Sequence, residues 1–103
     1  MKRLAIALTL LATTANATAE DRFEGIRQQW QTCAACHGPQ GQGGVGPTLA
    51  GQDAEQIIQK LMTYKRGETV GPRSVMMWNT AKSLTDGQIG TIGVYIQEGF
   101  PKQ

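Results

Sequence analysis

The sequence contains few of the residues that build most catalytic and metal sites. Its 103 residues include one histidine, two cysteines and six aromatic residues. A closed zinc site normally takes four cysteine or histidine ligands, so this supply disfavours structural zinc. The shortage of aromatics also limits the hydrophobic core, and domains of this size often depend on a disulfide, a metal or a cofactor.

A strong net charge is also missing. Ten basic residues stand against eight acidic ones, and Lys2 and Arg3 at the start of the chain account for the whole difference. No basic run interleaved with aromatic residues occurs. This balance argues against nucleic-acid binding and against attraction to an anionic membrane.

The beginning of the chain has the pattern of a secretory signal peptide. A short basic start is followed by a nearly unbroken apolar run, residues 4–11, and then by small residues up to Ala19. The run is shorter than the roughly 20 apolar residues of a transmembrane helix. We predict a signal peptide over residues 1–19, one domain over residues 20–103, a periplasmic location and no integral membrane segment in the mature chain. An uncleaved N-terminal anchor is the alternative.

Hydrophobic spacing predicts three helices and no strand. The first lies within residues 21–32, where Phe23, Ile26 and Trp30 share one face. The second is predicted to begin after Asp53 and the third after Thr85, because glutamine follows each of them by three positions, as in a capping box.

Glycine marks where the predicted helices end and where they pack. Gly67 is expected to end the second helix and Gly99 the third, which Pro101 then prevents from continuing. Gly90 and Gly93 lie inside the third helix and indicate either a flat face for a closely crossing helix or simply a weak helix.

Two long segments are predicted to be irregular. Residues 38–51 contain six glycines and two prolines, a composition that suits neither a helix nor a central strand. Residues 68–83 form the second such segment. The expected fold class is therefore all-α, with three main helices and long loops wrapped around a central group.

The most specific pattern is C-A-A-C-H at residues 33–37. Two thiols at this spacing add across two vinyl groups at one edge of a haem, and the adjoining histidine reaches the iron. We predict one covalently attached haem c per chain, held by Cys33, Cys36 and His37. The alternatives are zinc and a structural or redox disulfide as in thioredoxin-like domains, although no predicted strand precedes Cys33.

A second axial ligand of the iron has to come from a residue other than histidine, because His37 is the only one. A methionine thioether is the natural candidate. Met62 lies within a predicted helix among core-facing residues, where a methionine normally fills space. Met76 and Met77, which precede the last helix, remain as candidates.

The chain resembles class I c-type cytochromes, in particular small bacterial cytochrome c553 or a single domain of the two-haem cytochrome c4. The residues that carry the resemblance are CAACHG, GPTLAGQ, and MMW followed by LTDGQIGTIGVYI. Together they span nearly all of the chain after the predicted signal peptide. The resemblance implies the class I cytochrome c fold around one covalently bound haem.

The resemblance also implies roles for particular residues. Family members place the ligand methionine seven residues before the leucine that precedes the last helix; here that leucine is Leu84, which selects Met77, with Met76 as the alternative. Many members have proline after the ligand, where this chain has Trp78. Pro47 matches the position whose carbonyl accepts a hydrogen bond from the iron-bound histidine.

An iron with both axial positions filled changes only its oxidation state, so the expected function is one-electron transfer and not catalysis. We expect a diffusible periplasmic carrier that meets redox protein partners. The first alternative is a haem subunit of a larger oxidoreductase, for example a flavocytochrome sulfide dehydrogenase. The second is a gas-binding or peroxidatic haem protein with an open sixth site.

Overall fold

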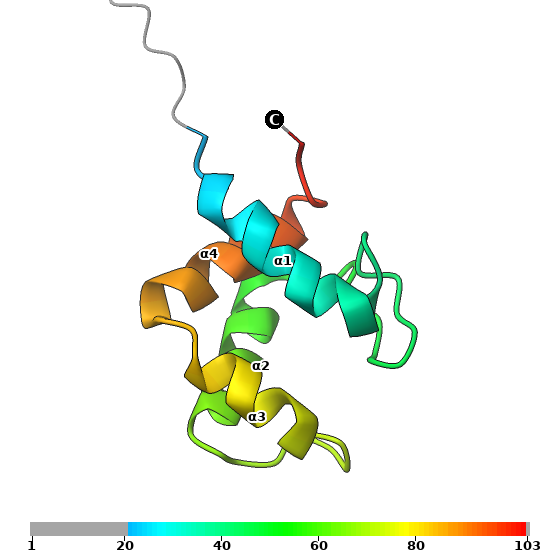
Figure 1. Ribbon diagram of the computed structural model, residues 1–103, viewed down its shortest axis with the longest axis vertical. Helices are drawn as coiled ribbons and strands as arrows, with labels where there is room; N and C mark the ends of the chain where they lie inside the picture. Colours follow the sequence, from blue (N-terminus) through cyan, green and yellow to red (C-terminus); the bar gives the residue numbers. More distant parts are fainter. Residues whose placement is uncertain (1–20, 103) are drawn as a thin grey trace, which may run out of the picture.

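Residues 21–102 are described by a computed structural model, and within that range the chain forms four α-helices and no strand (Figure 1). The helices are α1 (Glu24–His37), α2 (Ala54–Lys65), α3 (Val75–Lys82) and α4 (Asp86–Gln97). The predicted all-α class is confirmed, with the short helix α3 added to three main helices. The predicted signal peptide, residues 1–19, lies outside the described residues. No helix between residues 21 and 102 is both long and apolar enough to cross a bilayer.

The hydrophobic core lies where α1, α2 and α4 meet. Helix α2 packs against α4 and α3, and α1 packs against α4 (Figure 1). Burial of apolar side chains along these contacts provides the main stabilising term of a small domain. Most of the buried apolar side chains form one cluster: Phe23, Ile26, Trp30, Ile57, Leu61, Leu84, Ile89, Ile92, Tyr95 and Ile96.

Both predicted capping boxes are present. The Asp53 carboxylate accepts a hydrogen bond from the Gln56 backbone N–H at 2.8 Å, and the Gln56 side chain accepts one from the Asp53 N–H at 3.1 Å. Thr85 and Gln88 make the equivalent pair at the start of α4. Each cap stabilises its helix by about 1 kcal/mol. These caps determine where α2 and α4 begin.

Two local predictions were wrong. The first helix does not stop at residue 32 but continues through the C-A-A-C-H pattern to His37, because no helix-breaking residue occurs before Gly38. Residues 75–82, expected to be irregular, form α3. That stretch contains no glycine or proline, and Ser74 organises the turn before it by accepting hydrogen bonds from two backbone N–H groups.

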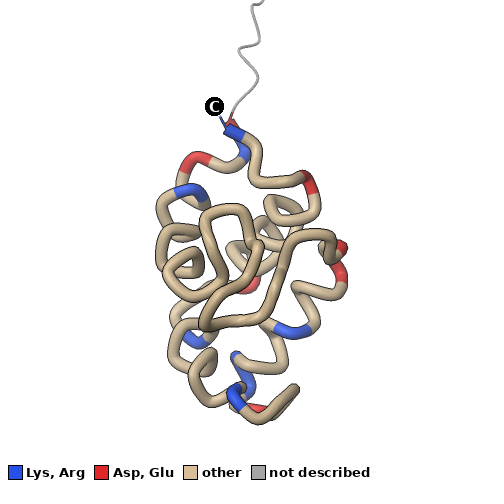
Figure 2. The backbone as a smooth tube through the Cα atoms, turned by 90° about the vertical axis from the view of Figure 1, so that its right-hand side faces the viewer, with Lys and Arg blue, Asp and Glu red and all other residues tan. Residues whose placement is uncertain are grey.

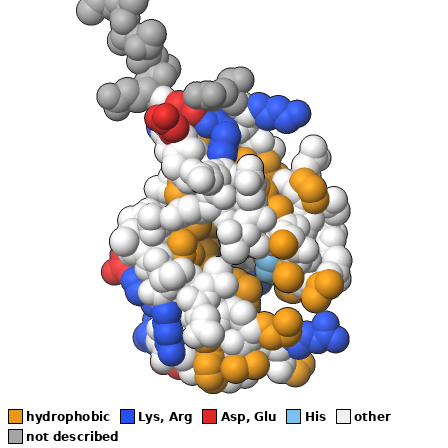
Figure 3. Space-filling model, viewed as in Figure 1, with side chains coloured by type: hydrophobic (Ala, Val, Ile, Leu, Met, Phe, Trp, Pro, Cys, Tyr) orange, Lys and Arg blue, Asp and Glu red, His pale blue; other side chains and the backbone are white. Residues whose placement is uncertain are grey.

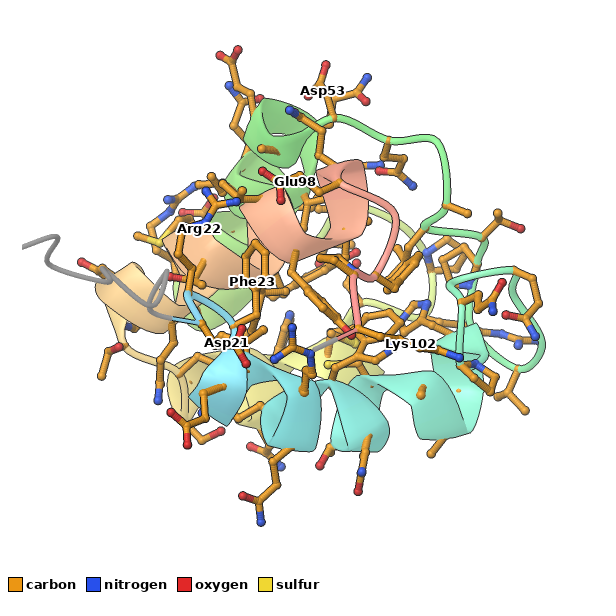
Figure 4. All side chains as sticks on the ribbon, turned by 90° about the horizontal axis from the view of Figure 1, so that it is seen from above. Asp21, Arg22, Phe23, Asp53, Glu98 and Lys102 are labelled. Atoms are coloured by element: carbon orange, nitrogen blue, oxygen red, sulfur yellow. The ribbon has the colours of Figure 1, made fainter. Side chains whose placement is uncertain are left out.

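The start of α1 faces the end of α4, as Figure 4 shows for Arg22, Phe23 and Glu98. The Phe23 and Tyr95 rings lie 5.3 Å apart between centroids. Arg22 and Glu98 pair at 2.9 Å on the exposed side, where such a pair contributes little stability. The ring packing therefore holds the two helices together at this end.

Helix α4 crosses α2 at Gly93. A Cβ atom at Gly93 would lie 2.8 Å from Ile58 Cγ1 and 2.9 Å from the Ala54 carbonyl oxygen, which is closer than side chains normally approach. A Cβ at Gly90 would meet nothing within 4 Å. The flat face predicted from the two glycines is confirmed at Gly93 and is wrong at Gly90.

Replacing these glycines by alanine should have opposite effects. Gly93→Ala should destabilise the holoprotein by about 1–3 kcal/mol, since the new methyl group overlaps the backbone of α2. Gly90→Ala should stabilise it by roughly 0.5–1 kcal/mol through helix propensity alone. Denaturant unfolding of both variants measures the difference. Equal stabilisation by both would show that the helices do not cross closely at Gly93.

Candidate functional site

A cavity of about 470 Å³ lies between the glycine-rich loop and all four helices, α1, α2, α3 and α4. Cofactor sites typically have volumes of about 300–1,000 Å³ and largely apolar walls. Hydrophobic side chains gather around a hollow on this face of the molecule (Figure 3). Among the aliphatic residues lining the cavity are Leu49, Ile57, Leu61, Leu84, Ile92 and Ile96.

Both cysteines line this cavity from the last turns of α1. Cys33 and Cys36 are three residues apart on a helix, so they share one side of it. Cys33 is half-buried and Cys36 is exposed. Burial raises the pKa of the Cys33 thiol, with a backbone hydrogen bond acting in the opposite direction. The helix thus presents two cysteine side chains at one edge of the cavity.

His37 lies at the end of α1, also against the cavity, and is only 6% exposed. Its ring Nδ1 is 2.7 Å from the Pro47 carbonyl oxygen. A carbonyl can only accept, so Nδ1 carries a hydrogen, and Nε2 is the ring nitrogen left to bind a metal. Metal-binding histidines are commonly oriented by such a contact. The role of His37 as an iron ligand, and of Pro47 behind it, stays a prediction.

The glycine-rich loop is attached to the end of α1 by backbone hydrogen bonds. Gly43 N–H donates to the His37 carbonyl at 2.7 Å, and Gly46 N–H donates to the Cys36 carbonyl at 2.8 Å. A Cβ at Gly46 would lie 2.8 Å from Cε1 of the His37 ring. The sequence alone does not indicate the contact between Gly46 and the His37 ring. The only available signal is that Gly46 directly precedes Pro47.

The two candidate methionines lie on α3 and both line the cavity. Met77 is half-buried and packs against the core, whereas Met76 is 62% exposed. Met62 packs against the core, as expected. Trp78 directs its indole N–H to the Glu68 carbonyl at 3.0 Å, which ties α3 to the preceding segment. The choice between Met76 and Met77 stays a prediction.

The donor atoms around the cavity suit a haem. An imidazole nitrogen and a thioether sulfur are ligands that haem iron accepts, and two thiols stand beside them. Within residues 21–102 no three His, Cys, Asp or Glu side chains come together as a metal site. The residues around the cavity fit a haem, which the two thiols would attach and whose iron the imidazole and a thioether would bind.

The cytochrome c family model matches residues 24–99, which include α1, α2, α3 and α4. The chain belongs to the cytochrome c family.

Three relatives match different shares of this cytochrome. Cytochrome c-554(548) of Halomonas halodenitrificans is 36% identical over 66 residues, which is 62% of this chain and 80% of that protein. Cytochrome c-553 of Nitratidesulfovibrio vulgaris is 26% identical over 101 residues, 95% of this chain and 99% of that protein. The thiosulfate dehydrogenase electron acceptor of Stutzerimonas stutzeri is 31% identical over 77 residues, 68% of this chain and 35% of that protein.

The expected resemblance to small class I c-type cytochromes is confirmed by these matches. Members of this family bind haem c covalently, and Cys33 and Cys36 fit the attachment pattern. This cytochrome is therefore an electron-transfer protein that binds haem c.

Alanine at Gly46 should disturb the site more than alanine at Gly25, an exposed glycine of α1 that does not line the cavity. A Cβ at Gly46 overlaps the His37 ring, whereas one at Gly25 meets nothing within 4 Å. We expect Gly46→Ala to destabilise the holoprotein by about 1–3 kcal/mol and to alter its visible spectrum. Gly25→Ala should keep the parent spectrum and should stabilise the helix by at most about 1 kcal/mol. Indistinguishable unfolding curves for the two variants would contradict the close contact under the ring.

Proposed function

We propose that this cytochrome is a diffusible periplasmic carrier of single electrons, with the haem attached through Cys33 and Cys36 and the iron bound by His37 and Met77. The observation that carries the proposal is that all four side chains line one apolar cavity, although α1 and α3 are far apart in the sequence. The signal-peptide pattern of residues 1–19 supports export to the periplasm.

The bound haem supplies an iron that alternates between the ferric and ferrous states as it takes up and releases one electron. The chain contributes orientation and exclusion of water. The Pro47 carbonyl holds the hydrogen on His37 Nδ1 and so keeps Nε2 free to bind. Gly46 lies against the ring and restricts its position. A site held in this way changes little between oxidation states, which favours fast transfer.

Partial burial supports Met77 as the second ligand. Its side chain packs against the hydrophobic core while lining the cavity, so its position is restrained. Met76 is mostly exposed and would have to leave solvent to reach the iron. A thioether ligand raises the reduction potential relative to a harder ligand.

Redox partners are proposed to contact the mouth of the cavity. Three exposed apolar side chains line the cavity: Val45, Val70 and Met76. The glycine-rich loop, which faces the viewer in Figure 2, carries no charged residue. Transient redox interfaces are small, often below about 1,200 Å², and their centres are depleted in charge. A weakly charged apolar mouth suits such brief contacts.

Replacing the two methionines separately tests the ligand assignment. Met77→Ala should open the sixth position, so the reduced holoprotein should bind carbon monoxide without denaturation. Met76→Ala should remain low-spin and unreactive, like the parent protein. Visible spectra of the reduced forms under carbon monoxide provide the measurement. The reverse result would identify Met76 as the iron ligand. Carbon monoxide binding by the parent protein would indicate a gas-binding protein with an open sixth site.

Size-exclusion chromatography of a native periplasmic extract tests whether the carrier is free. We expect the polypeptide, followed by antibody, and its Soret absorbance to elute together at the mass of one small domain. Co-elution with a larger catalytic or flavin-containing chain would make it a subunit of an oxidoreductase. The similarity to a thiosulfate dehydrogenase electron acceptor makes a thiosulfate dehydrogenase one candidate for that larger chain. Absence from the periplasmic fraction would contradict the proposed location.

A further inference from the structure

The charges that line the cavity are all of one sign. Of its described lining residues, only Lys60 and Arg73 carry a full charge at neutral pH, and no aspartate or glutamate is among them. An apolar cavity that presents cations without carboxylates is suited to a ligand that brings its own anionic groups.

Lys60 is the more deeply placed of the two cations. It is half-buried on α2, and its Nζ donates to the Gln52 side-chain oxygen at 2.8 Å. Gln52 in turn donates to the Thr48 carbonyl at 2.9 Å, which anchors it to the glycine-rich loop. An ammonium group has three donors, and the partner that Lys60 has among residues 21–102 is a neutral amide.

Lys65, on the same helix, has a carboxylate partner where Lys60 has a neutral amide. It is also half-buried, but its Nζ pairs with the Asp86 carboxylate at 2.8 Å, and it does not line the cavity. Arg73 differs in another way, because it is exposed and its nearest partner is the Val45 carbonyl at 3.4 Å. Lys60 is thus the half-buried cation of the cavity wall that lacks a carboxylate within the described residues.

We infer that Lys60, positioned by Gln52, binds a propionate carboxylate of the haem. A half-buried ammonium is costly without an anion, and the haem brings two carboxylates into a cavity that offers none of its own. The inference rests on the proposed occupation of this cavity by the haem. It assigns Lys60 a positioning and electrostatic role, in addition to the residues that bind the iron.

The pairing has a consequence for redox chemistry. An ammonium partner holds the propionate in its ionised form, so reduction adds an electron to the iron without adding a proton to the carboxylate. Without the lysine partner, burial would favour the protonated form of the propionate. The ferrous state would favour this form more than the ferric state does. Reduction then adds one electron to the iron and one proton to the carboxylate, so the potential falls as the pH rises between the two pKa values.

The other titratable or charged side chains that line the cavity come from three segments of the chain. His37, Cys33 and Cys36 come from α1, Tyr64 from α2, and Arg73 from the segment before α3. Burial raises the pKa of the Tyr64 hydroxyl, so Tyr64 stays neutral through neutral pH. Arginine is always charged, and the α1 side chains are occupied by the haem in the holoprotein.

Midpoint potentials of the holoprotein, measured from about pH 4 to pH 8, test the assignment. The variants are Lys60→Gln, Lys60→Arg and, as a matched control on the same helix, Lys65→Gln. We expect a flat profile near neutral pH for the parent, Lys60→Arg and Lys65→Gln. The midpoint potential of Lys60→Gln should show a pH-dependent step, which should be absent in Lys60→Arg. The same flat profile in Lys60→Gln as in the parent would overturn the inference.

A second measurement keeps the test independent of how well the variant folds. In the parent protein, NMR shifts of the haem substituents against pH report the propionate pKa values. An ion pair with Lys60 requires one of them to lie below the ordinary carboxyl range of about 4, and two ordinary values would overturn the pairing. Failure of the proposed function would instead appear in the carbon monoxide and chromatography experiments, which do not depend on the propionates.

Discussion

The contact between the His37 ring and the Pro47 carbonyl joins the two parts of the chain on which the site depends. His37 ends α1, and Pro47 lies in the glycine-rich loop, so this hydrogen bond attaches the loop to the helix that carries both cysteines. Backbone hydrogen bonds from Gly43 and Gly46 reinforce the same junction. Because a carbonyl oxygen can only accept, the contact also decides which ring nitrogen keeps its lone pair. One bond therefore contributes to both the fold and the chemistry.

The cavity explains why so small a domain has so few aromatic residues. Its walls are built by aliphatic side chains of α2, α4 and the loops, and the family's covalently bound haem supplies the apolar mass that the chain lacks. Four aromatic side chains form ring contacts around the crossing of α1 and α4: Phe23, Trp30, Tyr95 and Phe100. The hydrophobic core continues into the cavity wall, since several side chains belong to both: Trp30, Ile57, Leu61, Leu84, Ile92 and Ile96. Lys60, the half-buried cation of the cavity wall within residues 21–102, is paired with a neutral amide.

Features set by neighbours in the chain could be predicted well. Asp53 with Gln56 and Thr85 with Gln88 satisfy the first N–H groups of their helices within four residues, so the starts of α2 and α4 are local properties. Helix α3 could not be recognised in the same way. It has no side-chain cap, it is short, and it gains its stability by packing against α2 and burying Ala81 completely.

The sequence by itself determined the class of cofactor, because two cysteines and a histidine at this fixed spacing need no distant partner to be arranged. It also determined the starts and ends of α2 and α4, which depend on capping boxes and on the glycines that follow these helices. Only the tertiary structure decided that Gly93 and not Gly90 meets α2, that Gly46 lies against the His37 ring, and that Met77 is the more buried methionine of α3. These features depend on contacts between residues far apart in the chain, whose distances follow from how the helices and loops pack and not from any local pattern.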